Sequence, residues 1–387
     1  MRVLIVNTSE RTGGAAIAAN RLCQALRKQG VEARMLVRDR QTDLEEVVQA
    51  PCPRWHFLWE RLRILLANRL SRRNLWQTDI ANTGTDITRL PEFAWADVIH
   101  LHWVNQGFLS LDTLEKILRS GKKVVWTLHD QWPTTGICHY SEDCTRYRTH
   151  CTHCPLLMRP AARDLSYTVF QRKTRVYAQG HITFVGCSQW IAELARESAL
   201  TQGHRVESIP NAIDSGIFHP QDRVEARRQL GLPQEERIVL FCSQRVDDPR
   251  KGMHHLQAAM QQLEGVRMLR VGKGGDYEVH NERDMARLYA AADVFVIPSL
   301  QDNLPNTIVE ALSCGTPCVG FRAGGIPEMI SHLQDGYVAQ TGDADDLARG
   351  IRYALAHPEL REAAHRHAAE RYSEAHVAHE HIRIYEA

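Results

Sequence analysis

Short runs of apolar, mostly β-branched residues recur along the chain, and each is bounded by glycine, proline or polar residues. Stretches with helical spacing separate these runs, such as residues 15–30, which end at a glycine as helices commonly do. Continuous apolar strands that alternate with helices predict a parallel sheet covered on both faces. In the first half of the chain the predicted strands are residues 3–7, 33–37, 97–102, 123–129 and 182–188.

The same pattern starts again after residues 206–214. A second parallel sheet is therefore predicted, and a chain of 387 residues is long enough for two hydrophobic cores. The strands of this second set are residues 237–243, 266–272, 293–299 and 317–321.

Two successive doubly wound, Rossmann-like α/β domains are the simplest interpretation. They are predicted at residues 1–205 and 206–367, with the linker near residues 205–220. A closing helix of about residues 368–387 is expected to pack back on the first domain. Because ligands bind beyond the carboxyl ends of parallel strands, we expect the site in a cleft that both sheets face.

The composition excludes several classes of protein. A formal net charge of +1 gives no support to nucleic-acid binding. No apolar run approaches the roughly 18 residues that span a bilayer, and the first residues contain too short an apolar core for a signal peptide. We therefore expect a cytoplasmic protein.

Glycine turns follow two of the predicted strands. Gly13 and Gly14 come before a helix, so the backbone there can approach a ligand while helix amides point at it. A second turn, residues 271–275, contains Gly272 and repeats this arrangement. An ordinary tight turn explains each pattern equally well.

Basic residues follow the first strand of the second domain. Arg245, Arg250 and Lys251 lie in a predicted strand-to-helix loop, where cations can neutralise a diphosphate both in the ground state and as a leaving group. A solvated run of charges is the alternative interpretation.

Two carboxylates flank the start of a helix predicted at about residues 304–314. Asp302 lies before it, and Glu310 lies about two turns inside it. Amides near Leu304, Pro305, Asn306 and Thr307 can receive phosphate or sugar oxygens, and carboxylates can accept hydrogen bonds from sugar hydroxyls. Alternatively, Asp302 caps the helix and Glu310 is a surface residue.

The chain resembles the retaining nucleotide-sugar glycosyltransferases of family 4, which have the GT-B fold. The resemblance rests on PSLQDNLPNTIVEALSCGTPCVGFRAGGIPEMI, RVDDPRKG, IPNAID and NTSERTGGAAIAANRL, and it covers nearly the whole chain in order. The stretch TLHDQWPTTGICHYSEDC further resembles bacterial exopolysaccharide enzymes of the colanic-acid type.

The resemblance implies residue roles on the donor side. Asp302 takes the first acidic position of the family's Glu-x7-Glu pattern and would face the donor sugar, while Glu310 takes the second and would hold the ribose. Arg245 and Lys251 match the family's diphosphate clamp, and Gly14 matches its backbone contact in the first domain. Aspartate is one methylene shorter than glutamate, so the loop must approach more closely or the sugar must differ.

The family also implies a reaction. A hexosyl group passes from a nucleotide diphosphate sugar to a glycan or lipid-linked acceptor, the anomeric configuration is retained, and no catalytic metal is expected. His129, with Asp130 beside it, matches the active-site histidine. His102 ends the preceding strand and is expected on the acceptor side, or else packs under Trp103.

Of two rival functions, one stays open and the other is disfavoured. A catalytically silent nucleotide-sugar binding or scaffold protein could retain the same fold. A dinucleotide-dependent oxidoreductase is disfavoured, because no G-x-G-x-x-G turn follows the first strand.

Four cysteines lie within seventeen residues, and the last two form a Cys-x-x-Cys pair. Cys138, Cys144, Cys151 and Cys154 fit a structural zinc site, with His139, His150 and His153 as substitute ligands. Reduced thiols and disulfides are the alternatives, and a reducing compartment disfavours the latter.

Residues 54–73 place Trp, Phe and Leu among six arginines. This segment fits an interfacial helix on anionic lipid, which would suit peripheral association with the inner face of the plasma membrane and a lipid-linked acceptor. It fits an ordinary helix with a solvated basic face equally well.

Overall fold

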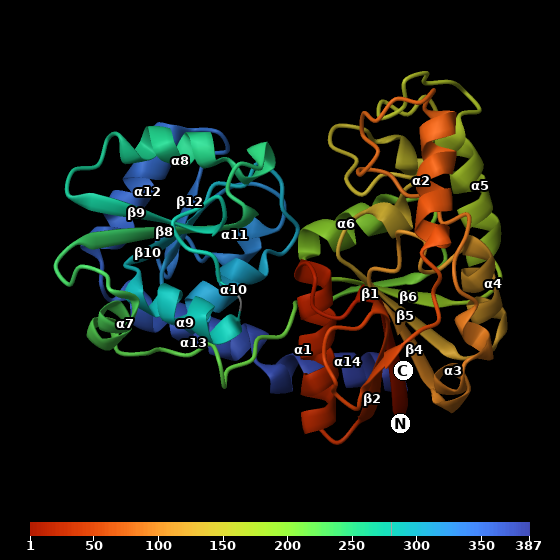
Figure 1. The fold of residues 1–387 in the computed structure, drawn as a ribbon, viewed down its shortest axis with the longest axis horizontal. Helices are drawn as coiled ribbons and strands as arrows, with labels where there is room; N and C mark the ends of the chain where they lie inside the picture. Colours follow the sequence, from red (N-terminus) through yellow and green to blue (C-terminus); the bar gives the residue numbers. More distant parts are fainter. Residues whose placement is uncertain (280) are drawn as a thin grey trace. The chain divides into compact units, whose positions relative to one another are not determined.

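The computed structural model describes residues 1–279 and 281–387, which form two compact units. The first unit contains Met1–Ile209 and Ala378–Ala387, and the second contains Pro210–Val377. The chain therefore leaves the first unit once and returns to it near its C-terminal end. Each unit is built around a parallel β-sheet with helices on its faces (Figure 1).

The sheet of the first unit has seven parallel strands in the order β3-β2-β1-β4-β5-β6-β7. β1 lies inside the sheet, and Val3, Leu4, Ile5 and Val6 are fully buried, which explains why its apolar run is continuous. The strands are β1 (Arg2–Ser9), β2 (Glu32–Asp39), β3 (Val47–Gln49), β4 (Val98–Leu101), β5 (Lys123–Leu128), β6 (Ile182–Gly186) and β7 (Arg205–Ser208).

The helices of the first unit begin at polar capping residues in several places. Ser110, Asp164 and Ser188 each accept a hydrogen bond from the backbone N–H three residues further on. The helices are α1 (Gly14–Lys28), α2 (Trp55–Ala67), α3 (Pro91–Trp95), α4 (Leu111–Arg119), α5 (Leu165–Tyr177) and α6 (Gln189–Glu197), with most of α14 (Glu374–Glu386).

The sheet of the second unit has five parallel strands in the order β12-β11-β10-β8-β9. Its central strands β10 and β11 are buried along their whole length. The strands are β8 (Arg237–Arg245), β9 (Val266–Lys273), β10 (Val294–Ile297), β11 (Cys318–Phe321) and β12 (Gly336–Ala339).

The second unit also contains seven helices, all within the described residues. They are α7 (Arg223–Leu230), α8 (Met253–Met260), α9 (Glu282–Ala291), α10 (Asn306–Ser313), α11 (Ile326–Met329), α12 (Ala344–Ala356) and α13 (Leu360–Tyr372). The helix predicted at about residues 304–314 is thus confirmed as α10, within two residues at each end.

Three strands and one helix differ from the sequence-based expectation. The apolar pattern did not predict β3, β7 or β12, because these short strands lie at sheet edges and carry polar or half-buried residues. Residues 368–387 were expected as one helix. The structure divides them at Ser373, where an isolated bridge to Ile213 interrupts the helical hydrogen bonds between α13 and α14.

Because all strands of each sheet are parallel, their carboxyl ends lie along one edge. Loops after β4 and β5 in the first unit, and after β8 and β10 in the second, carry most of the residues singled out in the sequence. Across the described residues, no helix combines the length and the apolar content that crossing a membrane requires.

Candidate active site

An ion pair joins two loops at the carboxyl edge of the second sheet. Lys251 lies in a short 3-10 helix after β8, and Asp302 lies in the loop after β10. Lys251 Nζ donates a hydrogen bond to Asp302 Oδ2 at 2.6 Å. Both side chains are largely shielded, so the pair is only partly screened by solvent.

Glycines allow these loops to pack so closely. A Cβ atom on Gly252, beside Lys251, would lie 1.9 Å from the carbonyl oxygen of Pro298, and one on Gly324 would lie 1.8 Å from that of Asp302. Both glycines also adopt positive φ angles. The Gly residues of RVDDPRKG and RAGGIPE therefore hold the lysine and aspartate loops in place.

Glu310 is a buried residue rather than a surface helix position. Its side chain, on the second turn of α10, is 6% exposed. Glu310 Oε2 accepts a hydrogen bond from the hydroxyl of Tyr289 on α9 at 3.0 Å. Burial and the nearby Glu310 carboxylate raise the pKa of the Cys242 thiol on β8 to about 12. The alternative that Glu310 lies on a solvated face is wrong.

Asp302 does not cap α10. The capping residue is Pro305, and no side chain makes a capping hydrogen bond at this end. Leu304 is buried, and Asn306 Oδ1 accepts a hydrogen bond from Asn211 Nδ2 of the IPNAID stretch at 3.0 Å. Thr307 follows in the first turn. The start of α10 is therefore held by contacts that leave the Asp302 carboxylate paired with Lys251.

Arg245 is placed differently from Lys251. Its side chain is 67% exposed, and its guanidinium donates two hydrogen bonds to Asp247, at 2.8 and 3.0 Å. This arrangement is the solvated ion pair that the sequence allowed. A role for Arg245 in a diphosphate clamp stays a prediction and would require exchange of Asp247 for phosphate.

Gly272 is required for the packing of the sheet. It lies near the end of β9 with φ 123°, and a Cβ atom there would lie 1.7 Å from the carbonyl oxygen of Ser243 on β8. Its contact with a donor stays a prediction.

In the first unit, Gly14 begins α1, and Gly13 before it has φ 92°. The predicted backbone contact of Gly14 with a donor also stays a prediction.

Two histidines, the buried His102 and the partly buried His129, form a pair after β4 and β5. His102 Nδ1 and His129 Nε2 lie 2.9 Å apart, and their rings stack with centroids 5.2 Å apart. Burial lowers the pKa of His129 to about 4 and lowers that of His102 well below its ordinary value. Two neutral imidazoles can share one hydrogen bond, with one nitrogen donating and the other accepting.

His100 extends this pair and was not predicted from the sequence. Its Nδ1 lies 2.7 Å from the Tyr385 hydroxyl, and its Nε2 lies 2.8 Å from the Thr127 hydroxyl. The ring also packs 4.4 Å from that of His102. The sequence His-Leu-His at the end of β4 could have indicated that His100 lies beside His102, because strand residues two positions apart share one face of the sheet.

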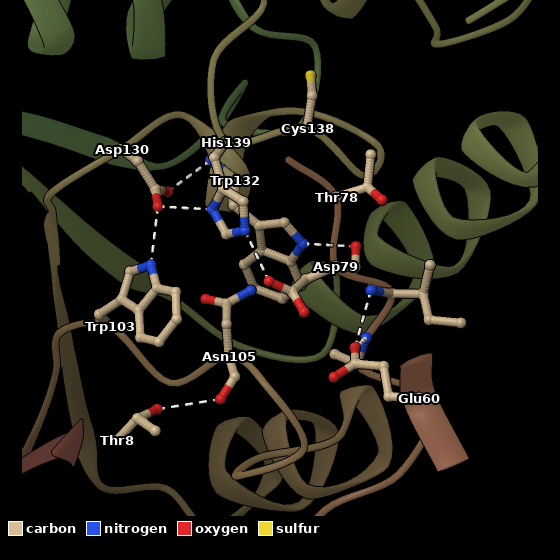
Figure 2. Close-up of polar contacts among 12 residues, drawn as sticks. Thr8, Glu60, Thr78, Asp79, Trp103, Asn105, Asp130, Trp132, Cys138 and His139 are labelled. Carbon is tan, nitrogen blue, oxygen red and sulfur yellow. Dashed lines mark hydrogen bonds and ion pairs between the residues drawn. The ribbon is translucent and has the colours of Figure 1, made fainter. Parts of the chain in front are cut away.

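Asp130 belongs to a polar chain that the sequence did not reveal (Figure 2). Its Oδ2 accepts a hydrogen bond from Trp103 Nε1 at 2.8 Å and lies 2.7 Å from His139 Nδ1. His139 Nε2 lies 2.6 Å from Asp79 Oδ2, and Asp79 forms an ion pair with Arg61 of α2. Figure 2 shows His139 between the two carboxylates.

These polar contacts keep Asp130 in its charged form. Burial alone would raise the pKa of Asp130, but His139 and the N–H groups of Trp132 and Trp103 hold it below its ordinary value. His139 is therefore not a free substitute zinc ligand, because both of its ring nitrogens face carboxylates. Trp103 also donates a hydrogen bond to Asp130, and its ring stacks on that of His139 with centroids 5.8 Å apart. Among the described residues, no ring stacking joins Trp103 to His102.

The four clustered cysteines line one cavity of about 290 Å³ in the first unit. None of Cys138, Cys144, Cys151 and Cys154 forms a disulfide. The backbone N–H of Gly136 donates to Cys151 Sγ at 3.2 Å, and burial raises the pKa of Cys151 to about 12. Over residues 1–279 and 281–387, no three His, Cys, Asp or Glu side chains are arranged to hold a metal ion. Zinc at this loop stays a prediction.

The paired parallel-sheet units have the GT-B fold of glycosyltransferases. HepE of Anabaena, solved in complex with UDP-glucose, aligns with 99% of this chain at a TM-score of 0.64, over 99% of its own length and with 16% identity. A model described as Glycosyltransferase Family 4 matches residues 12–216, and one described as Glycosyl transferases group 1 matches residues 236–357. The chain belongs to glycosyltransferase family 4.

Curated relatives match this chain at higher identity than HepE but over a smaller share of the chain. A D-inositol 3-phosphate glycosyltransferase of Segniliparus rotundus is 28% identical over 50% of this chain, and the match spans about half (53%) of the relative. A protein of Escherichia coli K12 named as the colanic acid biosynthesis glycosyl transferase WcaC is 24% identical over 85% of both chains. The match to WcaC agrees with the resemblance of this chain to bacterial exopolysaccharide enzymes.

Proposed function

We propose that the protein transfers a hexosyl group from a nucleotide diphosphate sugar to a growing polysaccharide or lipid-linked oligosaccharide in bacterial surface polysaccharide synthesis. The observation that carries this proposal is the Lys251–Asp302 pair beside the buried Glu310 at one sheet edge. A structural neighbour solved with UDP-glucose supports a nucleotide-sugar donor, and the match to WcaC supports a polysaccharide product.

The donor would be held by the second unit. Lys251, with Arg245, would neutralise the diphosphate, and amides at the start of α10 would receive its oxygens. Glu310 would accept hydrogen bonds from the ribose hydroxyls, because a buried carboxylate is a strong acceptor. Asp302 would orient Lys251 and accept a hydrogen bond from the donor sugar.

The reaction would proceed with retention at the anomeric carbon. The bond from this carbon to the diphosphate oxygen breaks while the acceptor hydroxyl attacks from the same face. The proton of that hydroxyl passes to the departing phosphate oxygen, so a dedicated general base is not needed. Lys251 would act mainly on the negative charge that develops on the leaving group.

His129 would contact the transferred sugar as a neutral imidazole. With a pKa of about 4, it carries no positive charge near neutral pH and acts through hydrogen bonding. His102 would hold its ring through the 2.9 Å contact. His102 and Asp130 are proposed to lie on the acceptor side.

Donor binding and turnover test this function directly. A thermal-shift screen of the full chain with UDP-, GDP- and ADP-sugars should reveal a preferred donor, because a ligand that binds only the folded state stabilises it. With that donor, Lys251→Ala should lower kcat/KM by roughly 100-fold or more. Arg267→Ala, an exposed cation elsewhere in the same unit, is the matched control.

The rival function is a catalytically silent donor-binding protein. In that case the thermal shift would persist while no transfer or donor hydrolysis could be detected. Wild-type turnover by Lys251→Ala would instead reject this site as the place of transfer.

A further inference from the structure

Helix α2 exposes its large apolar side chains to solvent. Trp55, Leu58, Trp59, Leu62 and Leu66 are all exposed, with Leu58 at 63% and Trp55 at 56%. Positions 55, 59, 62 and 66 follow the spacing of neighbours on one helix face. The helix therefore presents a continuous apolar stripe away from the core of the first unit.

The opposite face of α2 is buried and largely polar. Its buried residues are His56, Glu60, Arg61 and Ile64. This inverts the usual arrangement, in which a surface helix buries its apolar face and exposes its charged one. The ordinary helix with a solvated basic face, which the sequence left open, does not describe α2.

Polar contacts hold the inner face in place. Glu60 Oε1 accepts hydrogen bonds from the backbone N–H groups of Ile80 and Ala81, at 2.9 and 2.7 Å, and these bonds are drawn in Figure 2. Arg61 donates to the carbonyl oxygens of Leu75 and Thr78 at 2.7 and 3.1 Å. The outer Trp and Leu side chains are thus not needed to attach the helix to the unit.

Further exposed apolar residues adjoin this stripe. Trp76, 63% exposed, stacks on Phe57 of α2 with ring centroids 6.1 Å apart. The backbone N–H of Met158 donates to Asn68 Oδ1, just after α2, at 2.7 Å. With Leu70, these residues bring eight of the thirteen exposed large hydrophobic residues of the described chain to one region. A concentration of this kind marks an interaction surface.

The charges around the stripe have one sign. Five exposed arginines accompany it, and the only acid between residues 53 and 77 is Glu60, which is fully buried. The arginines are Arg54, Arg63, Arg69, Arg72 and Arg73. An occupant of this surface must therefore be apolar in its interior and negative at its border.

We propose that the α2 face, formed by the exposed apolar residues and these five arginines, docks the protein on a membrane that contains anionic phospholipid. Trp and Leu side chains enter the boundary between headgroups and acyl chains, while arginines reach lipid phosphates. A second copy of the chain fits less well, because a two-fold contact through this face would bring ten arginines together.

This inference goes beyond the proposed function, since the face is argued without reference to sugar transfer. Where that function holds, docking would bring the enzyme to a lipid-linked acceptor. The two can fail separately, because vesicle binding and donor binding are measured independently.

Vesicle co-sedimentation of the full chain tests the proposal. We expect binding to phosphatidylcholine vesicles containing phosphatidylglycerol, and roughly tenfold or greater weakening on vesicles of phosphatidylcholine alone. Replacing Arg63, Arg69, Arg72 and Arg73 by Gln should produce the same loss. Replacing Trp55, Trp59 and Leu62 by Ser should weaken binding to both kinds of vesicle.

Matched controls and fold checks accompany these variants. Leu44→Ser removes an exposed apolar residue elsewhere in the first unit, and Arg89→Gln with Arg119→Gln removes exposed cations there. These controls should bind vesicles like the wild type. Each variant should also keep its melting temperature and its thermal shift with donor, because the altered side chains lie on the surface.

Two outcomes would overturn the proposal. One is unchanged sedimentation of both α2-face variants. The other is a concentration-dependent dimer that Trp55→Ser with Trp59→Ser abolishes, together with no vesicle binding by the wild type, which would assign the face to contact between copies.

Discussion

Lys251 and Asp302 are paired at 2.6 Å although they lie 51 positions apart in the sequence. The pair joins the cation expected to bind the diphosphate to the first acid of the Asp-x7-Glu pattern. Asp302 therefore has a second role besides any contact with sugar, which is to fix the position of the Lys251 ammonium group.

Substitution of Asp302 should separate these two roles. Asp302→Asn keeps the size of the side chain but removes its charge, so we expect kcat/KM to fall about tenfold or more through loss of a charge-assisted hydrogen bond. Asp302→Glu keeps the charge and lengthens the side chain, so it should alter the relative kcat/KM of different donor sugars. Wild-type values and sugar preference in both variants would contradict the assignment, and Glu264→Gln is an exposed control in the same unit.

Glu310 and Tyr289 offer a second comparison. Glu310→Gln should raise the donor KM about tenfold or more, because a charged acceptor for the ribose is lost. Tyr289→Phe removes only the 3.0 Å hydrogen bond to this carboxylate, so it should cost roughly 1.5–3 kcal/mol of stability and leave KM nearly unchanged. Steady-state kinetics and thermal unfolding distinguish the two effects. An equal rise in KM for both variants would mean that Glu310 acts through packing.

The buried histidines should make the first unit sensitive to acid. Burial lowers the pKa of His129 to about 4, below the value of about 6.5 in an unfolded chain, and His100 and His102 shift in the same direction. Between these values the unfolded state binds protons that the folded state does not. Stability should thus fall as pH decreases from about 6.5 to 4, by roughly 1.4 kcal/mol per pH unit for each such histidine.

Melting temperatures at pH 7, 6 and 5 check this dependence. His129→Asn removes one of these groups, so its melting temperature should fall less steeply with pH than that of the wild type. His376→Asn changes a histidine in the second unit and serves as the control. Identical slopes for His129→Asn and the wild type would contradict the lowered pKa of His129.

Zinc at the cysteine loop is a prediction from the sequence that metal analysis can test at about one ion per chain. Four thiols line one cavity and match the ligand number of structural zinc, but no three metal-binding side chains of the described residues are arranged around an ion, so zinc would have to draw the thiols together. Elemental analysis of purified protein should find this metal, and Cys144→Ser with Cys154→Ser should lose it. Cys52→Ser, a half-buried cysteine outside the loop, should retain it. Protein free of zinc, with all four thiols open to titration, would remove the prediction.

The sheets and the approximate place of α10 could be predicted because they depend on local patterns. Buried parallel strands such as β1 read as continuous apolar runs, and Pro305 and Gly315 mark the ends of α10. Edge strands such as β7 lack this signal, because only part of each is covered. For helix α2, the pattern of apolar and polar residues predicts the wrong buried face, because the face that is buried carries Glu60 and Arg61.

Side-chain partners required the three-dimensional structure. Lys251 and Asp302 were each predicted as site residues, but their pairing depends on the adjacency of β8 and β10 in the sheet. The chain from Asp79 through His139 to Asp130 spans residues with no common motif. His139 was instead considered as a zinc ligand, because its neighbours in the sequence are cysteines.

The bond between Tyr385 and His100 also has a consequence for synthesis on the ribosome. His100 lies in an inner strand of the first sheet, whereas Tyr385 follows it 285 positions later in the sequence. All of Pro210–Val377 must be translated before Tyr385 is made. A nascent chain that already contains residues 1–209 therefore cannot finish this part of its core, and the first unit reaches full stability only after residues 378–387 have been made.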